Sequence, residues 1–173
     1  MSMLLTSTQL NDALDKIARE IAAAAPREAD IAIVGIRRRG ETLAQRLIPR
    51  IQAAGRKVAQ SGALDITLYR DDLSTIGPNA ITRGTEIDFD VTDKWIVLVD
   101  DVLYTGRSVR AALDALVDLG RPQAIRLAVV VDRGWRELPI QPDFVSLTVK
   151  TTAENIVKVK VSEIDGKDEV ELV

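Results

Sequence analysis

Two adjacent carboxylates, Asp100 and Asp101, follow an apolar run at residues 95–99. Two like charges at the tip of an apolar strand are costly unless something binds them. Each carboxylate accepts hydrogen bonds from a vicinal diol, such as the 2′- and 3′-hydroxyls of ribose. Carboxylates also tolerate a hydrated Mg²⁺ nearby. The pair therefore predicts a diol site that touches magnesium indirectly, through the ribose or through water.

The residues just beyond this pair favour an anion. Thr105, Gly106, Arg107 and Ser108 stand where a predicted helix, residues 108–120, begins. Backbone amides at a helix N-terminus and nearby hydroxyls bind phosphate, and Gly106 lets the backbone come close to the ligand. A diol on the acids and a phosphate on the helix start describe a ribose 5-phosphate.

Two further charged loops follow apolar strands. Arg37-Arg38-Arg39-Gly40 comes after residues 31–36, and its consecutive arginines are suited to a more highly charged group such as pyrophosphate. A sugar phosphate at one loop and a pyrophosphate at the other, with a carbon between them, is phosphoribosyl pyrophosphate. The third loop, Asp132 to Arg136, follows residues 124–132.

These loops need a scaffold of strands alternating with helices. Periodicity predicts an α/β fold, a mostly parallel sheet flanked by helices, whose ligands bind off the carboxyl ends of the strands. If the strands at 31–36, 94–101 and 124–132 are neighbours, the three loops surround one cleft. The expected helices are 7–25, 41–55 and 108–120. Ser7 or Thr8 should cap the first helix, and Pro49 should kink or break the second. The remaining expected strands are 64–70, 144–149, 156–161 and 168–173, and residues 71–88 read as a long mobile connection or hairpin tip.

Composition excludes several classes of function. The chain has 173 residues, a net charge of −3 and neither cysteine nor histidine, so one domain is expected and its chemistry must use carboxylates, arginines, hydroxyls and amides. The acidic balance disfavours a dedicated nucleic-acid binder. No apolar run is long enough for a bilayer and no secretion signal is seen, so a cytoplasmic location is expected. A receiver domain is excluded because 173 − 100 leaves 73 residues after Asp100, and neither GxxxxGK[ST] nor GxGxxG occurs.

The order of strand, two acids, short spacer and Thr-Gly resembles the type I phosphoribosyltransferases. Purine-specific members of that class commonly carry an acid directly before Thr-Gly, where this chain has Tyr104, which favours a pyrimidine. The stretches GIRRRGETLAQRL, LDITLYRDDLS, VLVDDVLYTGRSVRAALDALVDLGRP and LAVVVDRGWRELPI look like the PyrR family, bifunctional regulators of pyrimidine operons with uracil phosphoribosyltransferase activity. The resemblance covers nearly the whole chain, as a single domain over 1–173.

The resemblance implies that uracil and phosphoribosyl pyrophosphate give UMP and pyrophosphate, with Mg²⁺. Asp100 and Asp101 would be catalytic, and Thr105 to Ser108 would hold the 5′-phosphate. Arg38, Arg39 and Gly40 would bind pyrophosphate, helped by Arg70 on a flexible hood at about 64–90, although a solvated loop arginine explains Arg70 equally well. Tyr104, Asp132, Arg133 and Gly134 would lie at the base pocket. The sequence names no general base, so water and magnesium-bound pyrophosphate are both left as proton acceptors.

The same resemblance implies binding of a leader RNA when UMP or UTP is bound. Lys16, Arg19 and Arg136 are the candidate phosphate contacts, but acids surround the first two, and a solvated helix face explains them as well. Two readings therefore stay open beside the bifunctional one: a transferase in which RNA regulation is weak or lost, and a nucleotide-sensing regulator with vestigial catalysis. A homodimer or higher homo-oligomer is expected from the family.

Overall fold

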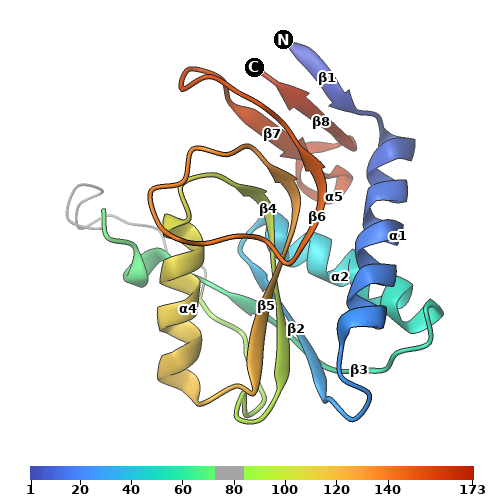
Figure 1. Cartoon of the computed structure of the whole chain (residues 1–173), viewed down its shortest axis with the longest axis vertical. Helices are drawn as coiled ribbons and strands as arrows, with labels where there is room; N and C mark the ends of the chain where they lie inside the picture. The colour runs from blue at the N-terminus through green and yellow to red at the C-terminus, as the bar shows by residue number, and fades with distance from the viewer. Residues whose placement is uncertain (73–83) are drawn as a thin grey trace.

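A five-stranded parallel sheet forms the centre of the computed structural model, which describes residues 1–72 and 84–173 (Figure 1). The strands are β2 (Ile31–Ile36), β3 (Val58–Leu64), β4 (Trp95–Leu103), β5 (Ala124–Asp132) and β6 (Phe144–Thr148). They lie in the order β3-β2-β4-β5-β6, and all pairs are parallel. Because β2, β4 and β5 are neighbours, the three charged loops lie at one edge of the sheet, as predicted.

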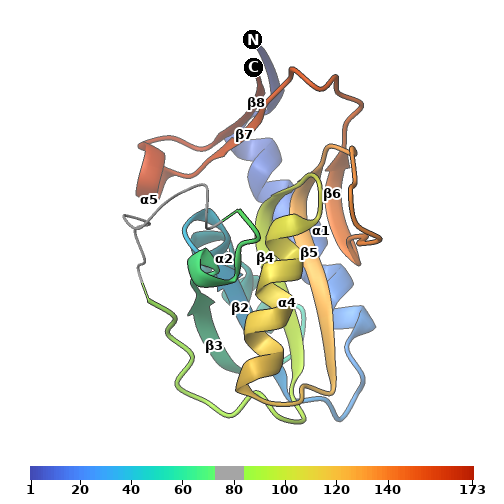
Figure 2. The same ribbon diagram turned by 90° about the vertical axis from the view of Figure 1, so that its left-hand side faces the viewer.

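Helices cover both faces of this sheet (Figures 1 and 2). Helix α1 (Ser7–Ala24) and helix α2 (Arg39–Ala53) pack on one face, and α4 (Arg107–Leu119) packs on the other. The predicted α/β architecture is therefore confirmed. No helix among the described residues is long and apolar enough to cross a membrane.

Two helix details differ from the sequence predictions. The cap of α1 is Thr6, which forms a capping box with Gln9, because the Thr6 hydroxyl accepts from the Gln9 amide and the Gln9 side chain accepts from the Thr6 amide. Helix α2 begins at Arg39 and continues through Pro49 without a break. Buried Leu47 and Ile51 hold the turns on both sides of that proline against the core, and this packing outweighs the lost hydrogen bond.

The expected strand at 64–70 is wrong. Strand β3 ends at Leu64, and a 3₁₀ turn, η1, covers Thr67–Tyr69. The Asp65 carboxylate accepts from the amide of Thr67 at 2.9 Å and from its hydroxyl at 2.6 Å, and this local turn competes with strand geometry. Beyond it, Glu86 forms an antiparallel bridge with Ala63, while residues 73–83, the centre of the predicted hood hairpin, lie outside the described residues.

A small antiparallel sheet lies beyond the carboxyl ends of the parallel strands (Figure 2). Its strands are β1 (Ser2–Leu5), β7 (Val157–Lys160) and β8 (Glu169–Leu172), in the order β1-β8-β7. The sequence patterns predicted β7 and β8 but not β1. The short helix α5 (Ser162–Asp165) joins β7 to β8. Because β7 is an edge strand, one of its sides has no strand partner within residues 1–72 and 84–173.

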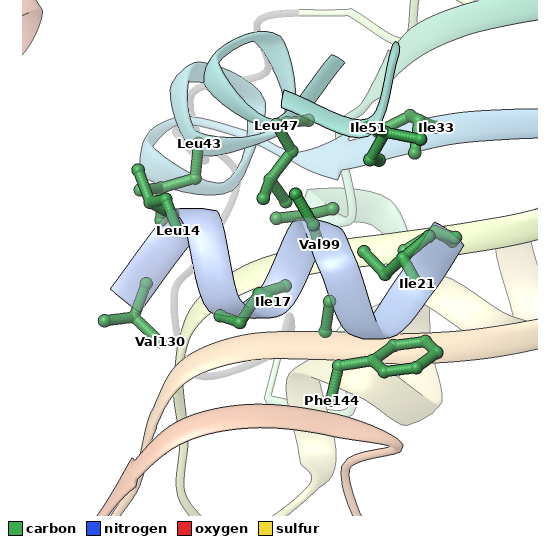
Figure 3. Close-up of a cluster of buried hydrophobic side chains, with 14 of the residues drawn as sticks. Leu14, Ile17, Ile21, Ile33, Leu43, Leu47, Ile51, Val99, Val130 and Phe144 are labelled. Carbon is green, nitrogen blue, oxygen red and sulfur yellow. The ribbon is translucent and has the colours of Figure 1, made fainter. Parts of the chain in front are cut away.

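The core between α1, α2 and the parallel sheet positions the start of α2 (Figure 3). Full burial of each large aliphatic side chain contributes roughly 1.5–3 kcal/mol, so many such contacts hold α2 rigidly on the sheet. The labelled members of this cluster are Leu14, Ile17, Ile21, Ile33, Leu43, Leu47, Ile51, Val99, Val130 and Phe144.

Candidate active site

The carboxylate pair lies inside β4 rather than at its end, because the strand continues to Leu103. The amide of Asp101 donates to Oδ1 of Asp100 at 2.9 Å, and the amide of Val102 donates to Oδ1 of Asp101 at 2.8 Å. Burial, followed by the charge of Asp101, raises the pKa of Asp100 well above its usual range. The charge of Asp100 is thus unfavourable in the protein by itself, which is the condition in which a cation or a donor-rich ligand binds, whereas Asp101 interacts with the charge of Arg39.

The Thr105 loop forms a small cavity of about 90 Å³ against Asp100. Gly106 caps α4 with a φ of 92°, a left-handed conformation that favours glycine, and the first helical bond runs from Arg110 to its carbonyl. The amides of Ser108 and Val109 have no acceptor in the described part of the chain. Tyr104, Thr105, Gly106 and Ser108 line this cavity, which therefore has the donors that a phosphate requires.

Arg107 belongs to this loop but directs its guanidinium elsewhere. Its Nε donates to Glu137 at 2.6 Å and its Nη1 donates to Asp71 at 2.5 Å. The exposed side chain thus connects the phosphate loop to two other segments. In this conformation, Arg107 offers the ligand its backbone and not its charge.

A larger cavity of about 400 Å³ opens on the other side of the carboxylate pair. It is lined by Arg39, Asp101, residues 157–160 of β7 and Asp165. Arg39 donates to Asp165 through Nε at 3.2 Å and through Nη2 at 2.6 Å. The cavity therefore lies between the sheet that carries the acids and the edge of the small sheet.

The arginine loop approaches β4 very closely, and this is possible because residue 40 is glycine. A Cβ on Gly40 would lie 2.4 Å from the carbonyl oxygen of Val99 and 3.2 Å from Cα of Asp100. The Arg37–Arg38 peptide bond is cis, and Arg37 pairs with Glu41 and Glu86. Arg38 is exposed and has no ion pair within the described ranges, so it is the loop's available cation, whereas Gly40 has a packing role.

The Asp132–Gly134 loop lies beside Tyr104. Asp132 accepts from the amide of Gly134 at 3.0 Å and from Arg136 at 2.7 Å. The buried Arg133 stacks its guanidinium 4.0 Å from the centre of the Tyr104 ring and donates to the carbonyl of Thr152. The structure thus brings these predicted base-pocket residues together, but Asp132, Arg133 and Gly134 are not among the described residues that line either cavity.

The remaining predicted contacts are spread over the surface. Arg70 pairs with its neighbour Asp72. Lys16 donates to the carbonyl of Val145 and pairs with Glu20, while Arg19 is exposed on the same helix. Arg136 donates to Asp132, to the Tyr104 carbonyl and to the Ile140 carbonyl, and the RNA contact expected of it stays a prediction.

The sequence patterns missed the wall that β7 gives to the larger cavity. Ile156 and Val173 exchange both backbone hydrogen bonds, at 2.8 Å each. Because such pairs alternate along an antiparallel ladder, Val157 and Val159 direct their N–H and C=O groups away from β8. These groups have no backbone partner among the described residues, so a row of unpaired donors and acceptors faces Asp101 and Arg39. The alternation of IVKVKV predicted the strand, but not that its edge would face β4.

Comparison with known proteins agrees with this geometry. The phosphoribosyl transferase domain family matches residues 1–165. The hypoxanthine-guanine phosphoribosyltransferase of Bacillus anthracis superposes with a TM-score of 0.75 at 17% identity, covering 100% of this chain and 98% of that one. The enzyme of Leishmania tarentolae in complex with GMP gives 0.72 at 14% identity, covering 98% and 94%. At such identities the likeness shows the fold. Fold, carboxylate pair and anion loops together define a type I phosphoribosyltransferase.

Sequence relatives narrow the class. The bifunctional protein PyrR of Thermus aquaticus is 55% identical over 169 residues, which cover 98% of this chain and 93% of the relative. That of Deinococcus radiodurans is 50% identical over 169 residues, covering 98% and 92%. The chain belongs to the PyrR family. Members of this family unite a uracil phosphoribosyltransferase with a regulator of pyrimidine operons, so the predicted function is confirmed at the level of the family.

Proposed function

We propose that the chain makes UMP and pyrophosphate from uracil and phosphoribosyl pyrophosphate in the cytoplasm, using the residues around β4. The observation that carries this assignment is the position of the pair Asp100–Asp101, which stands between the Thr105 loop and the arginine loop. The 5′-phosphate binds the free amides of Ser108 and Val109 and the hydroxyls of Thr105 and Ser108. Asp100 and Asp101 hold the ribose diol, and Arg38 and Arg39 bind the pyrophosphate.

The carboxylates act mainly through charge and position. As the bond from ribose C1 to pyrophosphate breaks, positive charge develops on the ring, and the negative charge of the nearby carboxylates stabilises it. Two carboxylates with substrate oxygens form a donor set that suits Mg²⁺, although the described residues contain no group of three or more carboxylates arranged to hold a metal ion by themselves. Magnesium bound there supplies charge neutralisation for the departing pyrophosphate. Uracil N1 forms the new bond to C1, and its proton leaves with the pyrophosphate, whose oxygens are bases that the reaction itself provides.

The free edge of β7 is suited to recognising uracil through backbone hydrogen bonds. Uracil presents an N3–H donor next to a carbonyl acceptor. The C=O of Val157 and the N–H of Val159 lie on the same side of the strand and face the cavity, so they match that pair. Tyr104, whose ring the Arg133 guanidinium contacts, lines the neighbouring small cavity. Backbone recognition explains why no polar side chain specific for a base was visible in the sequence.

The activity is tested directly with labelled uracil, phosphoribosyl pyrophosphate and Mg²⁺. The parent chain is expected to form UMP, and the Asp100→Asn/Asp101→Asn variant is expected to lose most of the rate. Hypoxanthine and guanine serve as competing bases that should not react. No UMP from the parent, or equal rates in both proteins, would contradict the assignment.

Base reading by β7 is tested by Val159→Pro. Proline removes the N–H that points away from β8, so the strand ladder is preserved while the predicted donor is lost. Val159→Ala is the matched control, because it also creates a core cavity but keeps the N–H. The KM for uracil should rise in the proline variant far more than in the alanine variant, and similar values in the two would argue against this contact.

We propose that regulation uses a different surface, where UMP or UTP in the site strengthens binding of leader RNA. Lys16 and Arg19 on α1 are the candidate phosphate contacts. Binding measured with and without UMP over a salt series should tighten with nucleotide and weaken as salt rises. A Lys16→Gln/Arg19→Gln variant should flatten the salt slope while UMP formation is unchanged. We also expect a homodimer, as in the family. Light scattering, which gives the molar mass of the protein in solution, checks this expectation.

A further inference from the structure

Helix α2 carries two arginines that point toward the small sheet, and only one of them lines the site. Arg39 and Arg46 are seven residues apart, which is close to two helical turns, so both project from the same face about 10 Å apart along the axis. Arg39 lines the larger cavity, whereas Arg46 does not contribute to it. Arg46 is nevertheless well buried, with 13% of its side chain exposed.

Each arginine reaches the end of β7 through one carboxylate. Arg39 donates to Asp165, and Oδ2 of Asp165 accepts from the amide of Val161 at 2.9 Å. Arg46 donates to both carboxylate oxygens of Asp168, at 3.0 and 2.8 Å, and Oδ1 of Asp168 accepts from the amide of Ser162 at 2.6 Å. Val161 and Ser162 directly follow the last residue of β7. Two parallel connections, each an arginine, a carboxylate and a backbone amide, thus tie α2 to this strand.

The two connections differ in what a substrate would do to them. Arg39 is a proposed pyrophosphate ligand, so phosphoribosyl pyrophosphate competes with Asp165 for its guanidinium. Arg46 lies two turns away, and its donors are occupied by Asp168, Glu163 and Ser162. A paired guanidinium with planar bidentate geometry is a rigid support. The Arg46 connection therefore keeps β7 in place while the Arg39 connection is exchanged.

We propose that Arg46 and Asp168 form a strut that sets the position of the free edge of β7 relative to the carboxylate pair of β4. Both are positioning residues, which govern nucleobase affinity without contacting the base. The inference rests on the proposed function, because it takes the cavity beside β7 as the uracil site. The core that holds α2 also buries Val157, Val159 and Val161, so loss of the strut shifts the free edge of β7 by a small distance and leaves the phosphate loops unchanged.

The test is the kinetic profile of Arg46→Gln. The KM for uracil should rise about tenfold, because small displacements of a positioning element have large effects on productive binding. The KM for phosphoribosyl pyrophosphate and kcat at saturating uracil should change less than about twofold. Arg46→Lys, which keeps the charge but loses the planar fork, should recover only part of the affinity.

Arg56→Gln is the matched control. Arg56 follows the other end of α2 and donates to the carbonyls of Ala22, Ala25 and Pro26, so its loss also removes hydrogen bonds between elements. Its uracil KM should match that of the parent. Unchanged uracil KM in Arg46→Gln, or an equal rise in Arg56→Gln, would overturn the strut.

Asp168 and Glu163 provide a second, independent comparison. Both pair with Arg46, but only Asp168 also holds the Ser162 amide, and Glu163 is 49% exposed. Asp168→Ala should therefore raise the uracil KM more than Glu163→Ala does. If Arg46→Gln does not fold, Asp168→Asn tests the same strut with a side chain of the same shape, and an unchanged uracil KM there would also overturn it.

Hydrogen exchange separates failure of the strut from failure of the proposed function. In Arg46→Gln the hydrogen-bonded amides of Lys158, Lys160, Val161 and Ser162 should exchange at least about tenfold faster, while those of β4 stay protected. If the parent chain forms no UMP, the proposed function is wrong, and the exchange rates still test the strut by themselves. Equal exchange in parent and variant removes the strut even when UMP is formed.

Discussion

Asp100 and Asp101 are neighbours in the chain, yet they open onto different cavities. Successive side chains of a strand point to opposite faces, and β4 continues through both residues. Asp100 therefore lines the small cavity of the Thr105 loop, and Asp101 lines the larger cavity with Arg39 and β7. One strand thus places one carboxylate beside the Thr105 loop and the next beside Arg39 and β7.

The first prediction is that Asp100→Asn stabilises the ligand-free protein while it lowers activity. Burial and the charge of Asp101 raise the pKa of Asp100, so the charged form is unfavourable in the folded chain. The Asn side chain keeps an acceptor for the Asp101 amide. Removing the charge should raise the free energy of unfolding by about 1 kcal/mol at neutral pH. Urea unfolding measures this difference.

The pH dependence of that gain follows from the raised pKa. Below the unfolded pKa near 3.8 both states hold the proton, so parent and variant should have equal stability. As pH rises through the folded pKa the parent loses stability relative to the variant, and the gap then stays constant. A gap that widened on acidification would mean that another group is responsible.

The second prediction concerns Gly40→Ala. The added Cβ would lie 2.4 Å from the Val99 carbonyl, so α2 and β4 must separate. We expect a loss of about 1–3 kcal/mol in stability and a fall in kcat, because the same contact positions Asp100. An unfolding curve and a kinetic profile both unchanged from the parent would show that the helix end can move without cost.

The third prediction distinguishes backbone from charge in the phosphate loop. Ser108 lines the cradle, whereas the guanidinium of Arg107 is occupied by Glu137 and Asp71. Ser108→Ala should raise the KM for phosphoribosyl pyrophosphate by a factor of about 5–10, the equivalent of one hydrogen bond. Arg107→Gln should raise it less, and the reverse order would place the arginine on the phosphate.

The fourth prediction is the acid sensitivity of the strut. Pairing with Arg46 lowers the pKa of Asp168 and Glu163 below their ordinary values of 3.8 and 4.5. A lowered pKa contributes stability that is present above the unfolded pKa and is lost as pH falls through the folded pKa. The difference in unfolding free energy between parent and Arg46→Gln should therefore be constant above about pH 5 and shrink below pH 4. A difference independent of pH would exclude ion pairing as its source.

Local patterns in the sequence determined the chemistry of this protein. Apolar runs ending in charge placed β2, β4 and β5, and the spacing of Asp100, Asp101, Thr105 and Gly106 predicted a ribose-phosphate site, because these features depend on residues close together in the chain. The turn that Asp65 imposes after β3 was missed, since a short polar side chain overrode an alternating pattern.

Tertiary structure decided what spans long separations. Nothing local shows that β7, more than fifty residues beyond Asp101, brings its unpaired edge to the site, or that Arg46 supports it through Asp168. Likewise, Arg107 and Arg136 appeared as free cations in the sequence, but partners distant in the chain or in a folded loop occupy their donors. The type of a side chain is set by sequence, whereas its availability depends on which partners packing brings within hydrogen-bond distance.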